Sequence, residues 1–425
     1  MTLMLGLWRL ATQAMEPVAP HILRARAQRG KEDPARLAER LGQASAPRAS
    51  GPLVWVHGVS VGESVSALPL VRRIAASGAR VLMTSGTPAS AEVLATRLGH
   101  ADFGGRVVHQ YAPLDAPGVV GRFLDHWQPD LALFVESELW PNTLMTLRVR
   151  NIPSALISAR ITEHTEAGWR RFPRSARALL SCFDLILAQD ETSAARLESL
   201  GARTSGLLNL KLAGEALSHD AAVFSRLSEA IGDRPVVLLL STHEGEDLPL
   251  LRACRAIRPR PLMIVMPRHP ARADHLCDAL RAEGFTLSQR SQQEAIAPDI
   301  DVYVADTLGE AGLFIRLADM VVVAGSFLSG IGGHNPLEPA RLSRGVITGP
   351  DIANWAGVYE ELIGAGGALK VETAADITAV LSQLLADNDA SRRMGQAAQR
   401  HTLSLDAGLD QLWPRLERLM QGPGA

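Results

Sequence analysis

The chain has 425 residues, which exceeds what one ordinary hydrophobic core supports, so we expect two domains of roughly 200 residues each. Its formal net charge is -2 and its isoelectric point is near 6.6, so the chain carries no overall basic field, and this excludes nucleic acid as the main partner. Cys182, Cys254 and Cys277 lie far apart and lack CxxC spacing. They indicate reduced core residues, as is typical of a protein whose catalytic portion lies in the cytoplasm.

The N-terminal segment, residues 1–15, is mostly apolar but contains Arg9, and it is too short and interrupted for an ordinary membrane-spanning helix. It also lacks the basic n-region and the small-residue cleavage site of a signal peptide. Its apolar residues recur at helical spacing. We therefore expect either an interfacial helix with basic flanking residues or a helix packed on the protein's own surface, and composition favours neither. The basic residues that follow are Arg24, Arg26, Arg29 and Lys31.

From about residue 53, short β-type runs alternate with helical stretches, which predicts βαβ crossovers and mainly parallel sheets. A first series of runs extends to residue 188, and a second begins at residue 236 and extends to residue 348. The stretch between roughly residues 206 and 234 separates them. The predicted fold is therefore α/β, with two doubly wound domains facing each other across a cleft.

A glycine-rich loop over residues 324–339 follows an apolar run, so it lies where open α/β sheets bind ligands. Its glycines allow the backbone to approach a ligand closely. A helix predicted to begin at Pro336 offers unpaired N–H groups to an anion, most simply a phosphate. Glu338 would repel that phosphate and is better suited to accept hydrogen bonds from sugar hydroxyls. Together these features predict a nucleotide-sugar site.

Acidic residues follow two predicted strands of the first series. Gly62 and Glu63 are interpreted either as a turn with an acid near a helix N-terminus, or as the site of a base that deprotonates an acceptor hydroxyl. Glu136 and Glu138 follow another strand. They form either an exposed loop face, or a pair in which one carboxylate binds substrate or positions the loop and the other caps a helix. Carboxylate pairs in general also permit glycosidase chemistry.

Polar and basic residues follow two strands of the second series. Ser241 and Thr242 fit helix capping as readily as phosphate binding. Arg268 and His269 end another strand, and the forked guanidinium of Arg268 can hold a phosphate or a carboxylate. Lys211, between the two series, is either a second positive charge for an anion or a solvated lysine. The 12 histidines lack metal-ligand spacing and are interpreted as polar binding groups.

Six motifs, taken in order, resemble the 3-deoxy-D-manno-octulosonic acid (Kdo) transferases of lipid A biosynthesis, and the resemblance spans nearly the whole chain. The last motif is the most specific. The motifs are VSVGE (59–63), ESELWPN (136–142), SAR (158–160), STHEGE (241–246), PRHP (267–270) and GGHNPLEP (332–339).

The resemblance implies a GT-B glycosyltransferase with two Rossmann-like domains. It would transfer Kdo from CMP-Kdo to a lipid A precursor with inversion, and it would use neither a catalytic metal nor a cofactor. Glu63 matches the family's general base, supported by Glu136 and Glu138, and the charge of the departing CMP would be stabilised by fixed donors. The candidate donor-binding residues are Lys211, Ser241, Thr242, Arg268, His269, Ser326, Gly332, Gly333, His334, Asn335 and Glu338, and the candidate acceptor-binding residues are Gly62 and Arg160.

The expected domains are a membrane-associating segment over residues 1–45, an acceptor-binding domain over 46–210, a CMP-Kdo-binding domain over 211–400 and a C-terminal helix over 401–425. Because the acceptor is amphiphilic, we expect a peripheral or monotopic protein on the cytoplasmic face of the inner membrane. One alternative is another GT-B nucleotide-sugar transferase or an epimerase. A second is a GT-B-like binding module without catalysis, against which Glu63, Arg268 and Glu338 argue.

Overall fold

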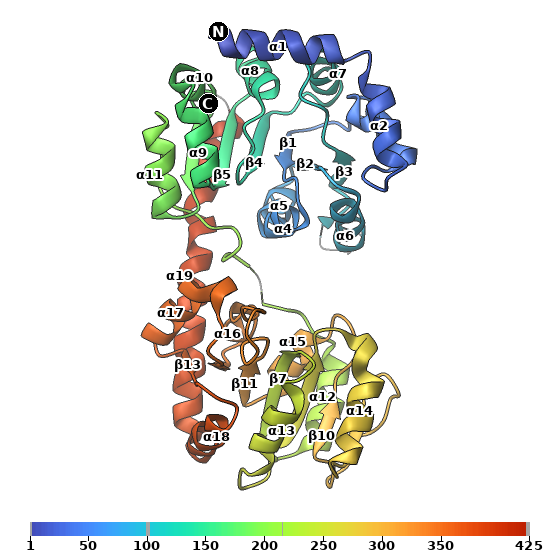
Figure 1. Cartoon of the computed structure of the whole chain (residues 1–425), viewed down its shortest axis with the longest axis vertical. Helices are drawn as coiled ribbons and strands as arrows, with labels where there is room; N and C mark the ends of the chain where they lie inside the picture. The colour runs from blue at the N-terminus through green and yellow to red at the C-terminus, as the bar shows by residue number, and fades with distance from the viewer. Residues whose placement is uncertain (1, 99–102, 215, 422–425) are drawn as a thin grey trace. The chain divides into compact units, whose positions relative to one another are not determined.

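The computed structural model describes residues 2–98, 103–214 and 216–421 (Figure 1). The chain forms two compact units, of which the first combines Met1–Gly214 with Asp406–Ala425 and the second is Glu215–Leu405. The long helix α19, Asn388–Gln421, contributes its first part to the second unit and its last part to the first.

The first unit contains a sheet of six parallel strands in the order β3-β2-β1-β4-β5-β6. The strand order reverses between β1 and β4, and such a reversal opens a crevice at the carboxyl ends of the two strands. Glu63 follows β1, and Glu136 and Glu138 follow β4, so the predicted acids flank this crevice. The strands are β1 Leu53–His57, β2 Arg80–Ser85, β3 Val107–Tyr111, β4 Leu131–Val135, β5 Ser154–Ala159 and β6 Leu185–Ala188.

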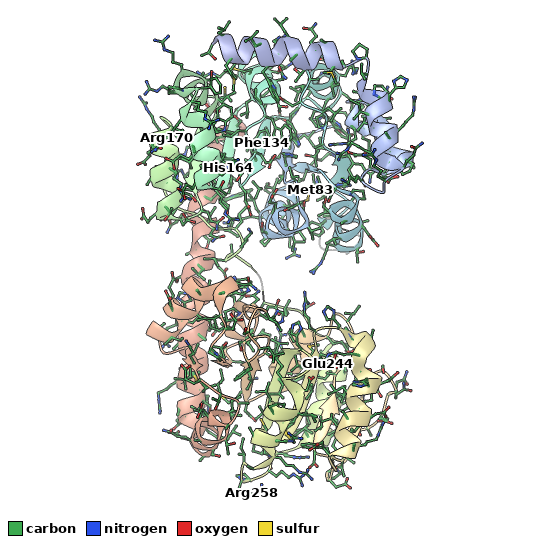
Figure 2. All side chains as sticks on the ribbon, in the orientation of Figure 1. Met83, Phe134, His164, Arg170, Glu244 and Arg258 are labelled. Carbon is green, nitrogen blue, oxygen red and sulfur yellow. The ribbon has the colours of Figure 1, made fainter. Side chains whose placement is uncertain are left out.

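Helices cover both faces of this sheet, so its central strands are buried on both sides and their sequences are almost continuously apolar. Alternate residues along each strand point to opposite faces of the sheet. Phe134 packs in one core cluster and Met83 in the other (Figure 2). The helices of this unit, besides the end of α19, are α1 Leu3–Met15, α2 Ala19–Ala27, α3 Leu37–Arg40, α4 Val61–Ser66, α5 Leu68–Ala76, α6 Pro88–Leu98, α7 Pro117–Trp127, α8 Pro141–Val149, α9 Glu163–Arg170, α10 Pro173–Leu180 and α11 Glu191–Ser199.

The N-terminal helix α1 packs against α7 and α8 (Figure 1). Leu5 on its inner face is buried, whereas Leu3, Leu7 and Leu10 are 82 %, 59 % and 64 % exposed. The helix therefore rests on the protein's own surface and also presents an apolar stripe outward. Among the described residues, no helix is long and apolar enough to cross a membrane.

The second unit contains seven parallel strands in the order β13-β12-β11-β7-β8-β10-β9. The strand order reverses between β7 and β11, so a second crevice opens between the loops that follow these two parallel strands. The strands are β7 Val236–Thr242, β8 Leu262–Pro267, β9 Leu287–Gln289, β10 Val302–Val304, β11 Met320–Val323, β12 Gly345–Thr348 and β13 Ala368–Lys370. The helices before α19 are α12 Ala221–Ile231, α13 Asp247–Arg255, α14 Ala273–Ala282, α15 Ala311–Leu317, α16 Leu337–Arg341, α17 Ala356–Gly364 and α18 Asp376–Ala386.

The predicted α/β class with two doubly wound parallel sheets is confirmed. The three cysteines are free and buried, and burial raises the pKa of each thiol, to about 12 in Cys254 and about 11 in Cys277. Protonated, buried thiols are inert core residues.

Candidate active site

Glu63 lies in the first turn of α4 at the crevice of the first unit. Ser60 is the N-cap, and its Oγ accepts a hydrogen bond from Glu63 N at 3.2 Å. In return, Glu63 Oε2 accepts from Val59 N at 2.6 Å and Ser60 N at 3.3 Å. This reciprocal capping box fixes the carboxylate through one oxygen. Within the described parts of the chain, Glu63 Oε1 takes no hydrogen bond, so it is the oxygen open to a proton.

Glu136 is buried and adopts a positive φ of 66°, which is strained for a residue other than glycine. Its Oε1 lies 2.6 Å from the ammonium of Lys211. Lys211 therefore lies within the first unit and forms an ion pair with a carboxylate beside the β1/β4 crevice. Its expected role on the donor stays a prediction.

Glu138 connects the β4 loop to the end of β1. Its Oε2 lies 3.5 Å from His57 Nε2 and accepts a hydrogen bond from Trp140 Nε1. The opposite ring nitrogen of His57, Nδ1, is 2.9 Å from Thr84 Oγ1 at the end of β2. This chain of contacts joins three neighbouring strand ends, so Glu138 is suited to position the crevice wall.

The two candidate acceptor residues differ in their surroundings. Gly62 is exposed in the first turn of α4, next to Glu63. Arg160 is also exposed, and its backbone N–H donates to Glu136 O at 3.4 Å, while Ser137 Oγ donates to Arg160 O. Arg160 thus belongs to the same loop cluster as the paired acids, and its guanidinium is accessible to an anionic ligand.

Three histidines gather at the crevice of the second unit. The rings of His243 and His334 are stacked with 5.0 Å between centroids, and their Nε2 atoms are 2.8 Å apart. His269 lies edge-on to His243 at 6.0 Å. Burial lowers the pKa of His334 to about 4, helped by His243 and Arg268. Burial also lowers the pKa of His243, with His269 and Arg272 contributing. Both rings are therefore neutral near pH 7 and surrounded by cationic or polar groups, an arrangement suited to an anion.

Glu246 holds the two loops of this crevice together, a role that the sequence did not reveal. Its buried carboxylate accepts from Gly325 N at 2.5 Å and from His243 N at 3.2 Å, both through Oε1. Burial raises its pKa. The only signal in the sequence was its place in the STHEGE motif. Glu244 of the same motif is exposed instead (Figure 2).

The side chains of several residues predicted to bind CMP-Kdo make hydrogen bonds within the protein instead. Thr242 Oγ1 accepts from Arg272 Nη2 at 2.8 Å, and Ser326 Oγ donates to Val323 O and accepts from Gly349 N. Asn335 Oδ1 accepts from Leu337 N at 3.0 Å. Their direct contact with a donor stays a prediction. Ser241 has a φ of 61° and is partly exposed, and Arg268 and His269 are exposed beside it.

The glycine-rich loop has positive φ at Gly325, Gly330, Gly332 and Gly333. Asp351, which the sequence did not single out, accepts from the N–H groups of Gly330 at 2.7 Å and Gly332 at 3.1 Å. The helix that follows, α16, begins at Leu337 and has 5 residues. Its short length limits its dipole, so an anion here would depend more on the side chains and glycine N–H groups than on the helix.

Arg272 is a further residue that sequence reasoning missed. It forms a two-point ion pair with Asp247 at 2.7 and 2.8 Å and also donates to Thr242 O. It thereby fixes the β7 loop from the segment after β8. Among the described residues, no group of three or more His, Cys, Asp or Glu side chains is placed to hold a metal ion.

Comparisons with known proteins agree with this geometry. The family model for 3-deoxy-D-manno-octulosonic-acid transferase (Kdotransferase) matches residues 35–213. The 3-deoxy-D-manno-octulosonic acid transferase of Bordetella pertussis is 35 % identical over 93 % of this chain and 95 % of that protein. The enzyme of the same name from Haemophilus influenzae is 33 % identical over 90 % of this chain and 92 % of that protein.

A solved structure agrees with this chain in its fold. A glycosyltransferase from Rickettsia africae has a TM-score of 0.56 at 11 % identity, covering 88 % of this chain and 100 % of that one. At this identity the likeness concerns the fold alone. The fold is of the GT-B type, as predicted. With the identities above, these findings show that the chain belongs to the 3-deoxy-D-manno-octulosonic acid transferase family and is a glycosyltransferase.

Proposed function

We propose that this protein transfers Kdo from CMP-Kdo to a sugar hydroxyl of a lipid A precursor, with Glu63 as the general base. The observation that carries the proposal is the position of Glu63 in a Kdo transferase family member: one carboxylate oxygen is held by two backbone donors at the β1/β4 crevice, and the other is open. A base fixed in this way can receive a proton without reorganising.

In the proposed reaction, the acceptor hydroxyl attacks the anomeric carbon of Kdo while its proton passes to Glu63. The bond from that carbon to the CMP phosphate oxygen breaks on the opposite side, so the centre inverts. CMP leaves with its negative charge and requires no proton. The charge must therefore be met by fixed donors, for which Arg268 and the glycine N–H groups of the second unit are the candidates.

The donor is assigned to the second unit. In the neutral pair of His243 and His334, one ring N–H makes the hydrogen bond between the two Nε2 atoms and the other, on a Nδ1 atom, is the donor left for a ligand, while the exposed Arg268 supplies a permanent positive charge. Glu338, on α16, is assigned to the ribose hydroxyls, because a carboxylate accepts two such hydrogen bonds and would repel the phosphate. The proposed reaction uses no metal and no cofactor.

We assign the protein to the cytoplasmic surface of the inner membrane. The apolar stripe of α1 continues into exposed Val18 and Ile22, and Val149 and Phe172 are further exposed apolar residues of the same unit. Arg24 and Arg29 are exposed near α2. Apolar area combined with basic residues favours an interfacial position on an anionic leaflet.

The test is mass spectrometry of a lipid A precursor incubated with CMP-Kdo and the purified full chain. The expected product is heavier by Kdo, and free CMP appears in step with it. Parallel incubations with a UDP-hexosamine test the alternatives of hexosamine transfer and epimerisation. Transfer or epimerisation of the hexosamine without any Kdo transfer would overturn the proposal. Binding of CMP-Kdo without turnover would instead support a binding module.

A further inference from the structure

An apolar cavity of about 420 Å³ lies in the first unit, between the N-terminal helices and the start of α7. Its wall includes Trp8 and Met15 of α1, Ile22 of α2 and Val119 of α7, and the first three are partly exposed. The volume lies within the range of about 300 to 1,000 Å³ that small-molecule sites occupy. An opening with exposed apolar walls can admit a hydrocarbon chain.

A second cavity, of about 280 Å³, adjoins the first. Both are lined by Arg26, Arg40, Leu114 and Trp140, so they meet at these residues. The second cavity is also lined by Val59, whose N–H holds the Glu63 carboxylate. The pair of cavities therefore leads from the exposed apolar surface to the loop that carries the proposed base.

The junction carries a surplus positive charge. Arg26 Nε lies 2.8 Å from Glu32 Oε1, and Arg40 Nε lies 3.3 Å from Glu32 Oε2, so one buried carboxylate serves two guanidinium groups. The Arg26 side chain remains 46 % exposed. Two arginines around one carboxylate leave a net charge that a phosphate would complement.

Besides Glu32, two acidic residues line the first cavity, Glu16 and Asp115, and both lie on its side of the junction. Glu16 Oε1 accepts from Gly118 N at 2.7 Å, and Asp115 accepts from the N–H groups of Asn142 and Thr143. Both carboxylates thus accept hydrogen bonds from backbone N–H groups at the starts of α7 and α8. The wall of the second cavity includes the two arginines and no acidic side chain. A phosphate is therefore favoured on the second cavity's side of the junction.

We propose that the two cavities form one binding site for an acylated sugar phosphate, with an acyl chain in the first cavity and a phosphate on Arg26 and Arg40 in the second. The site rests on the proposed function, since it places the sugar of the acceptor beside Glu63. It identifies the recognised features of the acceptor as one hydrocarbon chain and one phosphate, in addition to the reacting hydroxyl.

The test compares three acceptors in detergent: the lipid A precursor, its de-O-acylated form and its dephosphorylated form. Arg26→Gln should raise the acceptor KM of the phosphorylated precursor on the order of 10- to 100-fold and leave that of the dephosphorylated form nearly unchanged. Arg97→Gln is the control for loss of a positive charge, because Arg97 is exposed on α6 of the same unit and lines neither cavity. Ile22→Trp should narrow the apolar cavity and abolish the preference for the acylated precursor over the de-O-acylated form.

Calorimetric binding of the same three acceptors to the full chain separates this inference from the proposed function. If the wild type transfers Kdo but Arg26→Gln and Ile22→Trp treat all acceptors as the wild type does, the cavities are not the acceptor site. If Ile22→Trp lowers flotation on anionic liposomes and leaves acceptor binding unchanged, the cavity holds a bilayer lipid, which also overturns the inference. A wild type that binds the precursor with the expected preferences but transfers no Kdo would refute the proposed function alone.

Discussion

Replacing Glu63 by glutamine separates a catalytic role from a structural one. Glutamine keeps a side-chain oxygen that can accept from Val59 N and Ser60 N, so the entry into α4 should be preserved. It lacks a basic carboxylate and cannot take the proton of the acceptor hydroxyl. We expect a folded variant that binds CMP-Kdo and transfers Kdo very slowly.

The two expected losses differ enough to be told apart. Removing the negative charge from the first turn of α4 costs about 0.3 to 1 kcal/mol of stability. Losing general-base catalysis costs about 100- to 10,000-fold in rate, which corresponds to roughly 2.7 to 5.4 kcal/mol in the activation barrier. A small effect on stability therefore cannot account for the expected loss of rate.

The assay measures three quantities for each variant: the transfer rate by mass spectrometry, CMP affinity by calorimetry and the unfolding midpoint. Ser60→Ala is the control, because it removes the bond between Ser60 Oγ and Glu63 N but keeps the carboxylate. It should cost about 1 kcal/mol of stability and much less activity than Glu63→Gln. A Glu63→Gln variant that turns over at the wild-type rate would refute the proposed base. Equal losses of rate in both variants would assign the effect to the capping box.

Three further results are expected. Glu338→Ala should weaken CMP binding by roughly 1 to 3 kcal/mol in calorimetry without unfolding the protein, and an unchanged affinity would exclude the ribose role. Replacing exposed Leu7 and Leu10 together by glutamate should reduce flotation with anionic liposomes while transfer to detergent-dispersed acceptor persists, whereas truncating buried Leu5 should cost stability instead. The pKa of His334 is lowered from 6.5 to about 4, so between these two pH values the folded state binds fewer protons than the unfolded chain. The free energy of unfolding should therefore fall as the pH drops from 6.5 to about 4. Because the His334 side chain is only half-buried, we expect a loss of roughly 1 to 2 kcal/mol, and a His334→Gln variant with the same pH dependence of unfolding would contradict the assignment.

The central strands could be predicted from the sequence because they are buried on both faces and therefore almost purely apolar. Three edge strands, β3, β9 and β13, were not predicted. In β3, His109 and Gln110 interrupt the apolar pattern, and β9 and β13 have only 3 residues each. An edge strand is covered less completely than a central one, so its sequence carries a weaker hydrophobic signal.

The motifs located both crevices, since loops that follow parallel strands must gather at one edge of a sheet. The partners of individual side chains could not be predicted, because they depend on contacts between distant parts of the chain. Thr242 fitted helix capping as readily as phosphate binding, and nothing in the sequence indicated that its hydroxyl accepts a hydrogen bond from Arg272. Glu246 looked like one of several motif acids, yet it holds the loop at Gly325.

These contacts also distinguish the three acids at the β1/β4 crevice. Taking up a proton removes the negative charge of a carboxylate, so it disrupts an ion pair more than hydrogen bonds from neutral groups. Protonation of Glu136 would disrupt its ion pair with Lys211, and Glu138 already accepts from Trp140 and lies beside His57. Among the described residues, Glu63 Oε2 accepts hydrogen bonds from neutral backbone N–H groups and Oε1 has no partner, so Oε1 can gain a proton while the capping box stays intact. The neutral partners of Glu63, more than its proximity to the crevice, support the proposal that it is the base and that the other two carboxylates have positioning roles.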